Sequence, residues 1–264
     1  MDKKTNLKAA MQKHIDDYIK NKDTIQAQRL EEAKNNPNCL SFWYPQIKDL
    51  EIKTPQTMIV EFNYNDLLNS LEDNISDSFK ESLKKVEEAC DAIGYPCFIK
   101  NSLYSGKHSW KYTCFVENRS KIKSHLKNLT DDCYCVGAGD SLFIIVRKLI
   151  ETSPAFYAFE DMPITKERRY FVKDGKVTFH HPYWIPKAIH KPSCIDWEDK
   201  LTQLNWESDE EIQLLTHLSE KVSNAIDGAW SVDWLQDIHG DWYLIDMALE
   251  HNSFKWHDYK REIK

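Results

Sequence analysis

Two aspartates in the C-terminal part of the chain are the residues best suited to chemistry. Asp233 lies in the segment Trp230–Leu235, which alternates apolar and polar residues as a β-strand does. Asp246 lies in a second alternating segment, Trp242–Met247. The intervening residues 236–241 have the composition of a turn, so we expect a hairpin with the two carboxylates on neighbouring strands. Mg²⁺ binds one or two carboxylates together with phosphate oxygens and water, so the pair is a candidate magnesium site, unless both aspartates are ion-paired with lysine or arginine.

Two lysines upstream are suited to binding a polyphosphate. Lys100 ends the predicted strand Cys97–Lys100, and Lys107 follows in the polar loop 101–109. One ammonium held on a strand and another on a loop are suited to the successive phosphates of a nucleotide. The alternative for Lys100 is an ordinary surface lysine at the end of a strand.

An arginine and an apolar strand complete the candidate binding residues. Arg169 lies in an alternating segment on the face opposite Arg168, and its planar guanidinium is suited to bidentate recognition of phosphate or carboxylate. The alternative is a buried ion pair. The apolar segment 143–148 becomes cationic near its end, and an adenine ring can pack beside such a strand and hydrogen-bond its backbone. The residues expected to frame adenine are Ile144, Ile145, Val146 and Arg147, with an ordinary core strand as the alternative.

Composition limits the classes of function. The 264 residues have a hydrophobic content of 41%, enough for one large domain or two packed lobes. Only seven glycines occur, and no Gly-rich phosphate motif, so phosphate binding must rest on side-chain cations and metal. The net charge of −7 argues against general nucleic-acid binding. We find no signal-peptide pattern and no apolar run long enough to span a membrane. The seven scattered cysteines favour reduced thiols over a disulfide framework or a zinc site. We therefore expect a cytoplasmic protein.

The hydrophobic pattern predicts an α+β protein, because helices and hairpins are mixed without regular βαβ units. A long N-terminal helix over residues 3–34 ends at an Asn- and Pro-containing segment. A hairpin is predicted around the Asp174-Gly175 turn. The further expected helices are 76–92, 119–129 and 207–225, and the further expected strands are 58–62, 97–100, 110–116 and 142–149.

The order of these features resembles the ATP-grasp superfamily from about Cys39 to Phe254. Two branches are similar: the phage-encoded branch, and the family of the eukaryotic cell-division-cycle factor that promotes assembly of translation initiation factor two. The matching motifs are Trp43-Tyr44-Pro45, Ile52-Lys53-Thr54, Lys100, Trp110, Val146-Arg147-Lys148, Glu167 to Val172, Asp233 and Asp246. The eukaryotic family has a metal-binding Asn two positions after its second acidic residue, where this chain has Ala248. The chain also lacks the acidic insertion of that family, which favours the phage-like branch. A phage-encoded protein would be located in the host cytoplasm.

The resemblance implies an N-terminal helical arm, 1–38, followed by an ATP-grasp domain, 39–264, with two lobes of about 39–142 and 143–264 that clasp a nucleotide. It implies a carboxylate–amine ligase that uses ATP and Mg²⁺, forms an acyl phosphate and releases ADP. Lys107 and Arg169 would be catalytic and, with Lys100, would bind ATP, while Asp233 and Asp246 would hold the metal. The carboxylate and amine substrates belong to a peptide, a protein or a small molecule.

Two other classes of function remain open on the sequence. One is an assembly factor that binds ATP without turnover and acts on a protein partner, which is compatible with the N-terminal helix and with Ala248. The other is a nucleotidyltransferase that uses Lys100 as a covalent nucleophile. The Lys-x-Asp-Gly motif of that class is absent around Lys100, and Lys173-Asp174-Gly175 lies in a predicted turn with different spacing.

Overall fold

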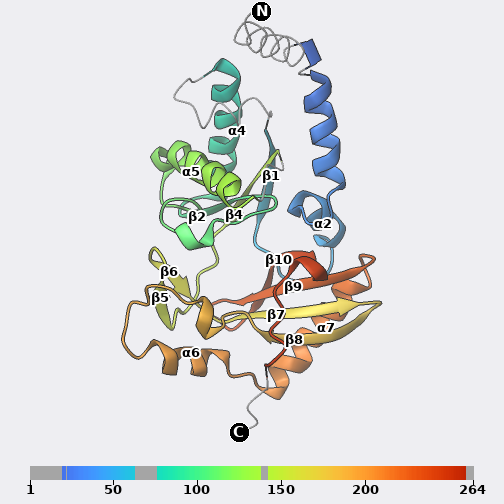
Figure 1. Cartoon of the computed structure of the whole chain (residues 1–264), viewed down its shortest axis with the longest axis vertical. Coiled ribbons are helices and arrows are strands. Elements are labelled where there is room, and N and C mark those ends of the chain that lie inside the picture. Colours follow the sequence, from blue (N-terminus) through green and yellow to red (C-terminus); the bar gives the residue numbers. More distant parts are fainter. Residues whose placement is uncertain (1–19, 22, 63–75, 138–141, 260–264) are drawn as a thin grey trace, which may run out of the picture.

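The structure is a computed structural model that describes residues 20–21, 23–62, 76–137 and 142–259. Two antiparallel sheets, each covered by helices, form two lobes that lie one above the other in Figure 1. The predicted α+β class is confirmed. Residues 20–21 and 23–35 are helical as expected, whereas the predicted helical residues 3–19 lie outside the described part of the chain.

The first lobe contains a four-stranded sheet in the order β1-β4-β2-β3. Helices α4 (Asp77–Ile93) and α5 (Ile122–Cys135) pack against the sheet through an apolar core (Figure 1). Helix α4 begins where the Ser76 hydroxyl accepts a hydrogen bond from the main-chain N–H of Phe79, an N-cap that its sequence predicts. The strands of this sheet are β1 (Thr57–Glu61), β2 (Cys97–Asn101), β3 (Phe115–Val116) and β4 (Phe143–Lys148).

The second lobe contains a four-stranded sheet in the order β10-β9-β7-β8, with helix α7 (Asp209–Ser223) packed on one face. The Asp174-Gly175 turn joins β7 to β8, and both residues have positive φ angles of 50° and 75°, as this hairpin turn requires. The predicted acidic hairpin is present as β9 and β10. The strands are β7 (Glu167–Lys173), β8 (Lys176–Pro182), β9 (Ala229–Gln236) and β10 (Trp242–Leu249).

Smaller elements connect and extend the two lobes. Helix α2 (Leu40–Ile47) buries Trp43 in the same core as residues of β4 and of the second sheet, so it joins the lobes. The small hairpin of β5 (Phe156–Ala158) and β6 (Met162–Ile164), together with α6 (Trp197–Asn205), adds a third apolar cluster. Within the described residues, no helix combines the length and apolar character needed to cross a membrane.

The structure of the first lobe differs from the sequence-based predictions in two respects. The predicted strand 110–116 is formed only at Phe115–Val116, because the preceding residues turn back on themselves and Thr113 donates to the carbonyl of Gly106. Gly106 has a φ angle of 65°, and a Cβ atom there would lie 3.0 Å from Thr113, so this tight turn requires glycine. The first sheet also includes Phe143–Lys148, which places the division between the lobes after β4 instead of at residue 142.

Candidate functional site

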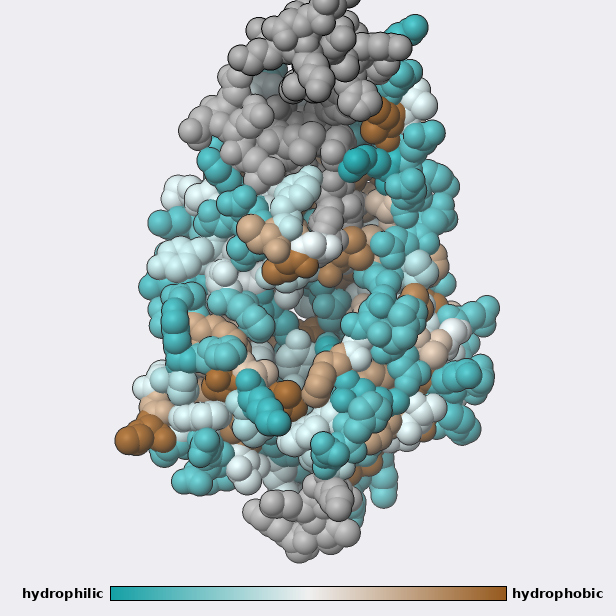
Figure 2. All heavy atoms as spheres, viewed as in Figure 1, coloured by the Kyte–Doolittle hydropathy of each residue, from teal (hydrophilic) through white to brown (hydrophobic). Residues whose placement is uncertain are grey.

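A cavity of about 560 Å³ lies between the two sheets. One face of the molecule is visibly hollowed between the first lobe above and the second lobe below (Figure 2). The first lobe contributes residues of β2, β4 and the loop that follows β2, and the second contributes residues of β7, β9 and β10. The charged residues that line the cavity are Lys100, Lys107, Lys111, Arg147, Lys148, Glu151, Asp161, Glu167 and Asp246.

Lys100 reaches the cavity because it alternates with the core residues of β2. Cys97 and Ile99 are buried in the core of the first lobe, and the intervening positions face the cavity. The Lys100 ammonium donates to Asp246 across the lobes at 2.8 Å, and Lys100 is 3% exposed. Burial lowers the pKa of Lys100, and the neighbouring Arg147 lowers it further, although Asp246 opposes both effects. The predicted surface-lysine alternative is therefore excluded for this side chain.

Lys107 forms a second contact between the lobes. Its ammonium lies 3.2 Å from Oε1 of Glu167 at the start of β7. Burial acts to lower the pKa of Lys107, but Glu167 and Asp233 outweigh it and raise that pKa above its ordinary value. Glu167 is 4% exposed and its Oε2 atom has no hydrogen-bond partner among the described residues, so this buried oxygen can accept a hydrogen bond from a ligand.

The paired aspartates lie opposite each other on β9 and β10, as the sequence predicts. Arg169 donates to both carboxylate oxygens of Asp233, at 2.7 and 2.8 Å. Asp233 is thus paired with Arg169, and Asp246 with Lys100. These ion pairs are the alternative to metal binding that the sequence also allowed. Asp246 lines the cavity, whereas Asp233 and Arg169 lie next to it without lining it.

These carboxylates fit a magnesium site that is completed by phosphate. Among the described residues, no group of three or more His, Cys, Asp or Glu side chains could hold a metal by itself. Mg²⁺ commonly uses only one or two carboxylates when a nucleotide supplies further oxygens, so two opposed aspartates are sufficient. Ala248 lies opposite Ser231 in the register, and the Ser231 hydroxyl donates to the carbonyl of Ala248. A side-chain amide oxygen is therefore missing at the position that the resemblance assigns to Asn.

Arg147 has an unused hydrogen-bond donor in the cavity wall. Its guanidinium donates to Thr57 at 3.1 Å and to the main-chain carbonyl of Ile245, while its Nη2 atom is buried without a partner among the described residues. Burial lowers the pKa of Arg147 to about 10, although Asp246 opposes this effect. A buried donor without a partner is costly, so this atom favours a ligand that carries an acceptor, such as phosphate.

The prediction that Ile144, Ile145 and Val146 frame adenine is not supported by their positions. Ile145 is buried in the core of the second lobe, while Ile144 and Val146 are buried in the core of the first. Strand β4 therefore has both faces covered, and its apolar residues do not line the cavity.

Sequence reasoning missed most of the apolar walls of the cavity, although the resemblance included Trp110 among its matching motifs. The chain that follows β4, residues 148–152, lines it. Phe98, Trp110 and Phe115 line it as well, and their rings are in contact, with Trp110 stacked on Phe115 at 5.6 Å between ring centres. The alternation within β2 placed Phe98 on the same face as Lys100 and was a signal for the first of these residues. These surfaces suit an aromatic base, which gains from apolar and stacking contacts.

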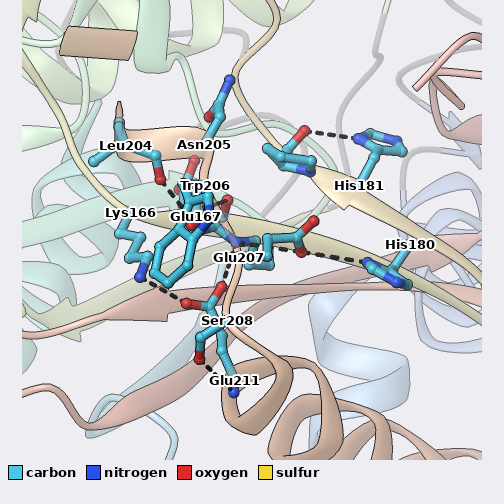
Figure 3. A network of polar contacts seen from close by, with 12 residues as sticks. Lys166, Glu167, His180, His181, Leu204, Asn205, Trp206, Glu207, Ser208 and Glu211 are labelled. Atoms are coloured by element: carbon cyan, nitrogen blue, oxygen red, sulfur yellow. Dashed lines mark hydrogen bonds and ion pairs between the residues drawn. The ribbon is translucent and has the colours of Figure 1, made fainter. Parts of the chain in front are cut away.

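A buried polar network fixes the strand that carries Glu167 and Arg169. Arg168, on the opposite face of β7, donates to Glu211 at 2.6 Å and lies 3.5 Å from Glu207. Lys166 also contacts Glu211, and His180 contacts Glu207 (Figure 3). The further acceptors of the Arg168 guanidinium are the main-chain carbonyls of Glu167, Leu204 and Trp206.

Comparison with solved structures shows that the chain has an ATP-grasp fold. Its structure is similar to that of Cdc123 from Schizosaccharomyces pombe, with a TM-score of 0.55 and 14% identity, covering 83% of this chain and 87% of that one. A C-terminally truncated Cdc123 from the same organism has a TM-score of 0.53 and 15% identity, covering 80% of this chain and 82% of that one. The fold is thus an ATP-grasp fold related to that of Cdc123.

A weaker structural similarity is to a ligase. D-alanine–D-alanine ligase from Bacillus anthracis, in complex with ATP, has a TM-score of 0.45 and 13% identity, covering 81% of this chain but 54% of that one. No protein-family model matches the sequence, and no curated protein matches it significantly. At such identities the comparisons show the fold alone.

Proposed function

We propose that the chain binds Mg·ATP in the cavity between its lobes and uses it to join a carboxylate to an amine. The observation that carries this proposal is the cavity itself, where Lys100, Lys107 and Arg147 surround Asp246 beside apolar aromatic walls. The cations suit the phosphates, the aromatic residues suit the base, and the unpartnered Nη2 of Arg147 requires an acceptor. The ATP-grasp fold supports the same ligand.

Different residues of the site bind the phosphates and the metal. Lys100 and Lys107 hold the phosphates, and Arg169 steadies the terminal phosphate or the substrate carboxylate through its planar guanidinium. Asp233 and Asp246 hold Mg²⁺, which supplies positive charge to neutralise the phosphates during transfer. Binding therefore replaces two of the present ion pairs, because phosphate takes the place of Asp246 at Lys100 and of Glu167 at Lys107.

The proposed reaction requires no covalent nucleophile from the protein. The substrate carboxylate oxygen attacks the γ-phosphorus, the bond to the β,γ-bridging oxygen breaks, and ADP leaves. The amine nitrogen then attacks the carbonyl carbon of the acyl phosphate, inorganic phosphate leaves, and the nitrogen loses a proton to solvent. The contribution of Lys107 and Arg169 is to position the reacting groups and to offset negative charge on the transferred phosphoryl group.

An ADP-release assay over a panel of carboxylates and amines tests the ligase reaction. We expect ADP release that requires both substrates and is lost in Arg169→Met. Intact-mass measurement after incubation with ATP should find no AMP adduct on Lys100, because this lysine acts as a phosphate ligand. A stable adduct would instead support the nucleotidyltransferase alternative.

A second candidate is an assembly factor that binds ATP without turning it over. Ala248, at the position where the resemblance expects a metal-binding Asn, is the observation that favours it. This candidate predicts tight Mg·ATP binding with no ADP release under any substrate combination. Introducing the missing amide with Ala248→Asn should then strengthen Mg²⁺-dependent binding or produce turnover.

A further inference from the structure

One aromatic side chain contacts cations of both lobes beside the candidate site. Nζ of Lys107 lies 4.3 Å from the centre of the Tyr183 ring, and Cζ of Arg169 lies 4.8 Å from it. Lys107 belongs to the first lobe, whereas Arg169 and Tyr183 belong to the second. Both distances are within the range of cation–π attraction, so a single ring contacts the two residues proposed to act on the transferred phosphate.

The ring is held in place by its own surroundings. Tyr183 directly follows the end of β8, and its main-chain N–H donates to the carbonyl of Glu167 at 3.1 Å. The ring of Trp184 packs edge-on against that of Tyr183, with ring centres 4.9 Å apart, and Trp184 is 3% exposed. The hydroxyl of Tyr183 forms no hydrogen bond with a described residue, so the part of this side chain that the site uses is the ring.

The Tyr183 ring differs physically from the carboxylate partners of these two cations, although Lys107 also lies 5.6 Å from the centre of the Trp184 ring. Glu167 and Asp233 attract Lys107 and Arg169 as carboxylates, and they compete with a phosphate for the same cations. An aromatic face attracts a cation through its quadrupole but carries no net charge, so it can keep its contact while a phosphate binds on the other side. It also offsets the mutual repulsion of two cations that must converge on one group.

We propose that Tyr183 is a positioning residue that holds Lys107 and Arg169 in place for the terminal phosphate of a nucleoside triphosphate. The proposal rests on the proposed function, since it assumes that the triphosphate lies at these cations. The base, ribose and inner phosphates contact other residues. Loss of the ring should therefore weaken the binding of a triphosphate more than that of a diphosphate.

Calorimetric titration of the full chain with the magnesium complexes of ATPγS and ADP tests this role. In Tyr183→Leu, we expect ATPγS affinity to fall about 3- to 30-fold, the range that one to two cation–π contacts provide, with ADP affinity changed less than about twofold. Tyr183→Phe retains the ring and should keep the wild-type ratio of the two affinities. Tyr183→Met retains more flexible bulk and replaces the leucine variant if that variant does not fold.

The matched control is Tyr243→Leu, which removes a ring that has a cation contact with Lys53, at 5.8 Å, and does not line the cavity. It should leave both affinities unchanged. A wild type that binds neither nucleotide overturns the proposed function and this role with it. A wild type that binds both, together with a Tyr183→Leu or Tyr183→Met variant of unchanged affinity ratio, overturns the role of Tyr183 alone. A Tyr183→Phe variant as weak as Tyr183→Leu also overturns it, because the ring would then not be the active part.

Discussion

Two neighbouring arginines on β7 have different surroundings. Arg168 is fully buried, and main-chain carbonyls as well as Glu211 accept its hydrogen bonds. Arg169, on the opposite face, donates to Asp233 and lies against the Tyr183 ring beside the cavity. Both arginines pair with a carboxylate, so an ion pair by itself does not distinguish a structural arginine from a ligand-binding one. The distinction lies in the remaining donors. Those of Arg168 go to three main-chain carbonyls at 2.9 to 3.1 Å, whereas Nη1 of Arg169 makes only a long, exposed hydrogen bond of 3.4 Å to the carbonyl of Phe254.

Removing the structural arginine should have the largest effect on stability. In Arg168→Met, Glu207 and Glu211 lose a buried cationic partner, although Lys166 and His180 still contact them. We expect a loss of about 3–5 kcal/mol in the free energy of unfolding, because removing one of the cations that balance two buried carboxylates leaves excess buried negative charge. Urea denaturation measures the loss. A loss below about 1 kcal/mol would show that the network of Figure 3 does not anchor β7.

The matched variant on the other face should separate stability from binding. Arg169→Met removes one partner of Asp233, and we expect a smaller loss of about 1–3 kcal/mol in the free energy of unfolding. Affinity for Mg·ATPγS should fall about 10- to 100-fold, as expected for loss of a charged hydrogen-bond donor. Denaturation and calorimetry on the same preparations give both numbers. Equal effects of the two arginine variants on ATPγS affinity, corrected for the folded fraction, would remove the functional difference between the two faces.

Replacing the aspartates one at a time tests whether they hold metal. Asp233→Asn and Asp246→Asn each remove an anionic ligand, so the affinity for ATPγS should become less dependent on Mg²⁺ concentration. If the aspartates only form ion pairs with Arg169 and Lys100, these variants will lose stability without a change in metal dependence. Titrations at several Mg²⁺ concentrations distinguish the two results.

The pH dependence of stability gives a smaller, more specific signal. Burial acts to raise the pKa of Asp246, but Lys100 and Arg147 outweigh it and lower that pKa below 3.8. The unfolded chain therefore binds the proton more readily, so this group contributes stability above about pH 3.8 that is lost as the pH falls toward its folded pKa. We expect the unfolding free energy of the wild type to fall more steeply below pH 4 than that of Asp246→Asn. Parallel curves in urea titrations between pH 3 and 6 would contradict the inferred Lys100–Asp246 contact.

Local patterns predicted the residues whose role depends on strand alternation. The opposite faces of Arg168 and Arg169 and the hairpin that opposes Asp233 to Asp246 follow from a period of two residues and from turn composition. The adenine-framing role of Ile144 to Val146 could not be judged in this way, because an apolar run does not reveal whether a core or a cavity covers each face. Contacts between lobes, such as Lys107 with Glu167 and Tyr183, join residues distant in the sequence and carry no local signal.

The central claim is that Mg·ATP binds in the cavity between the lobes, and calorimetric titration with Mg·ATPγS tests it most directly. The informative set is the wild type, Lys100→Met, and the control Lys221→Met, whose lysine pairs with Glu51 away from the cavity lining. We predict one site per chain in the wild type and in the control, with binding about 10- to 100-fold weaker in Lys100→Met, because a buried cation that contacts phosphate is lost. Absence of binding to the wild type, or equal affinity in all three proteins, would contradict the account.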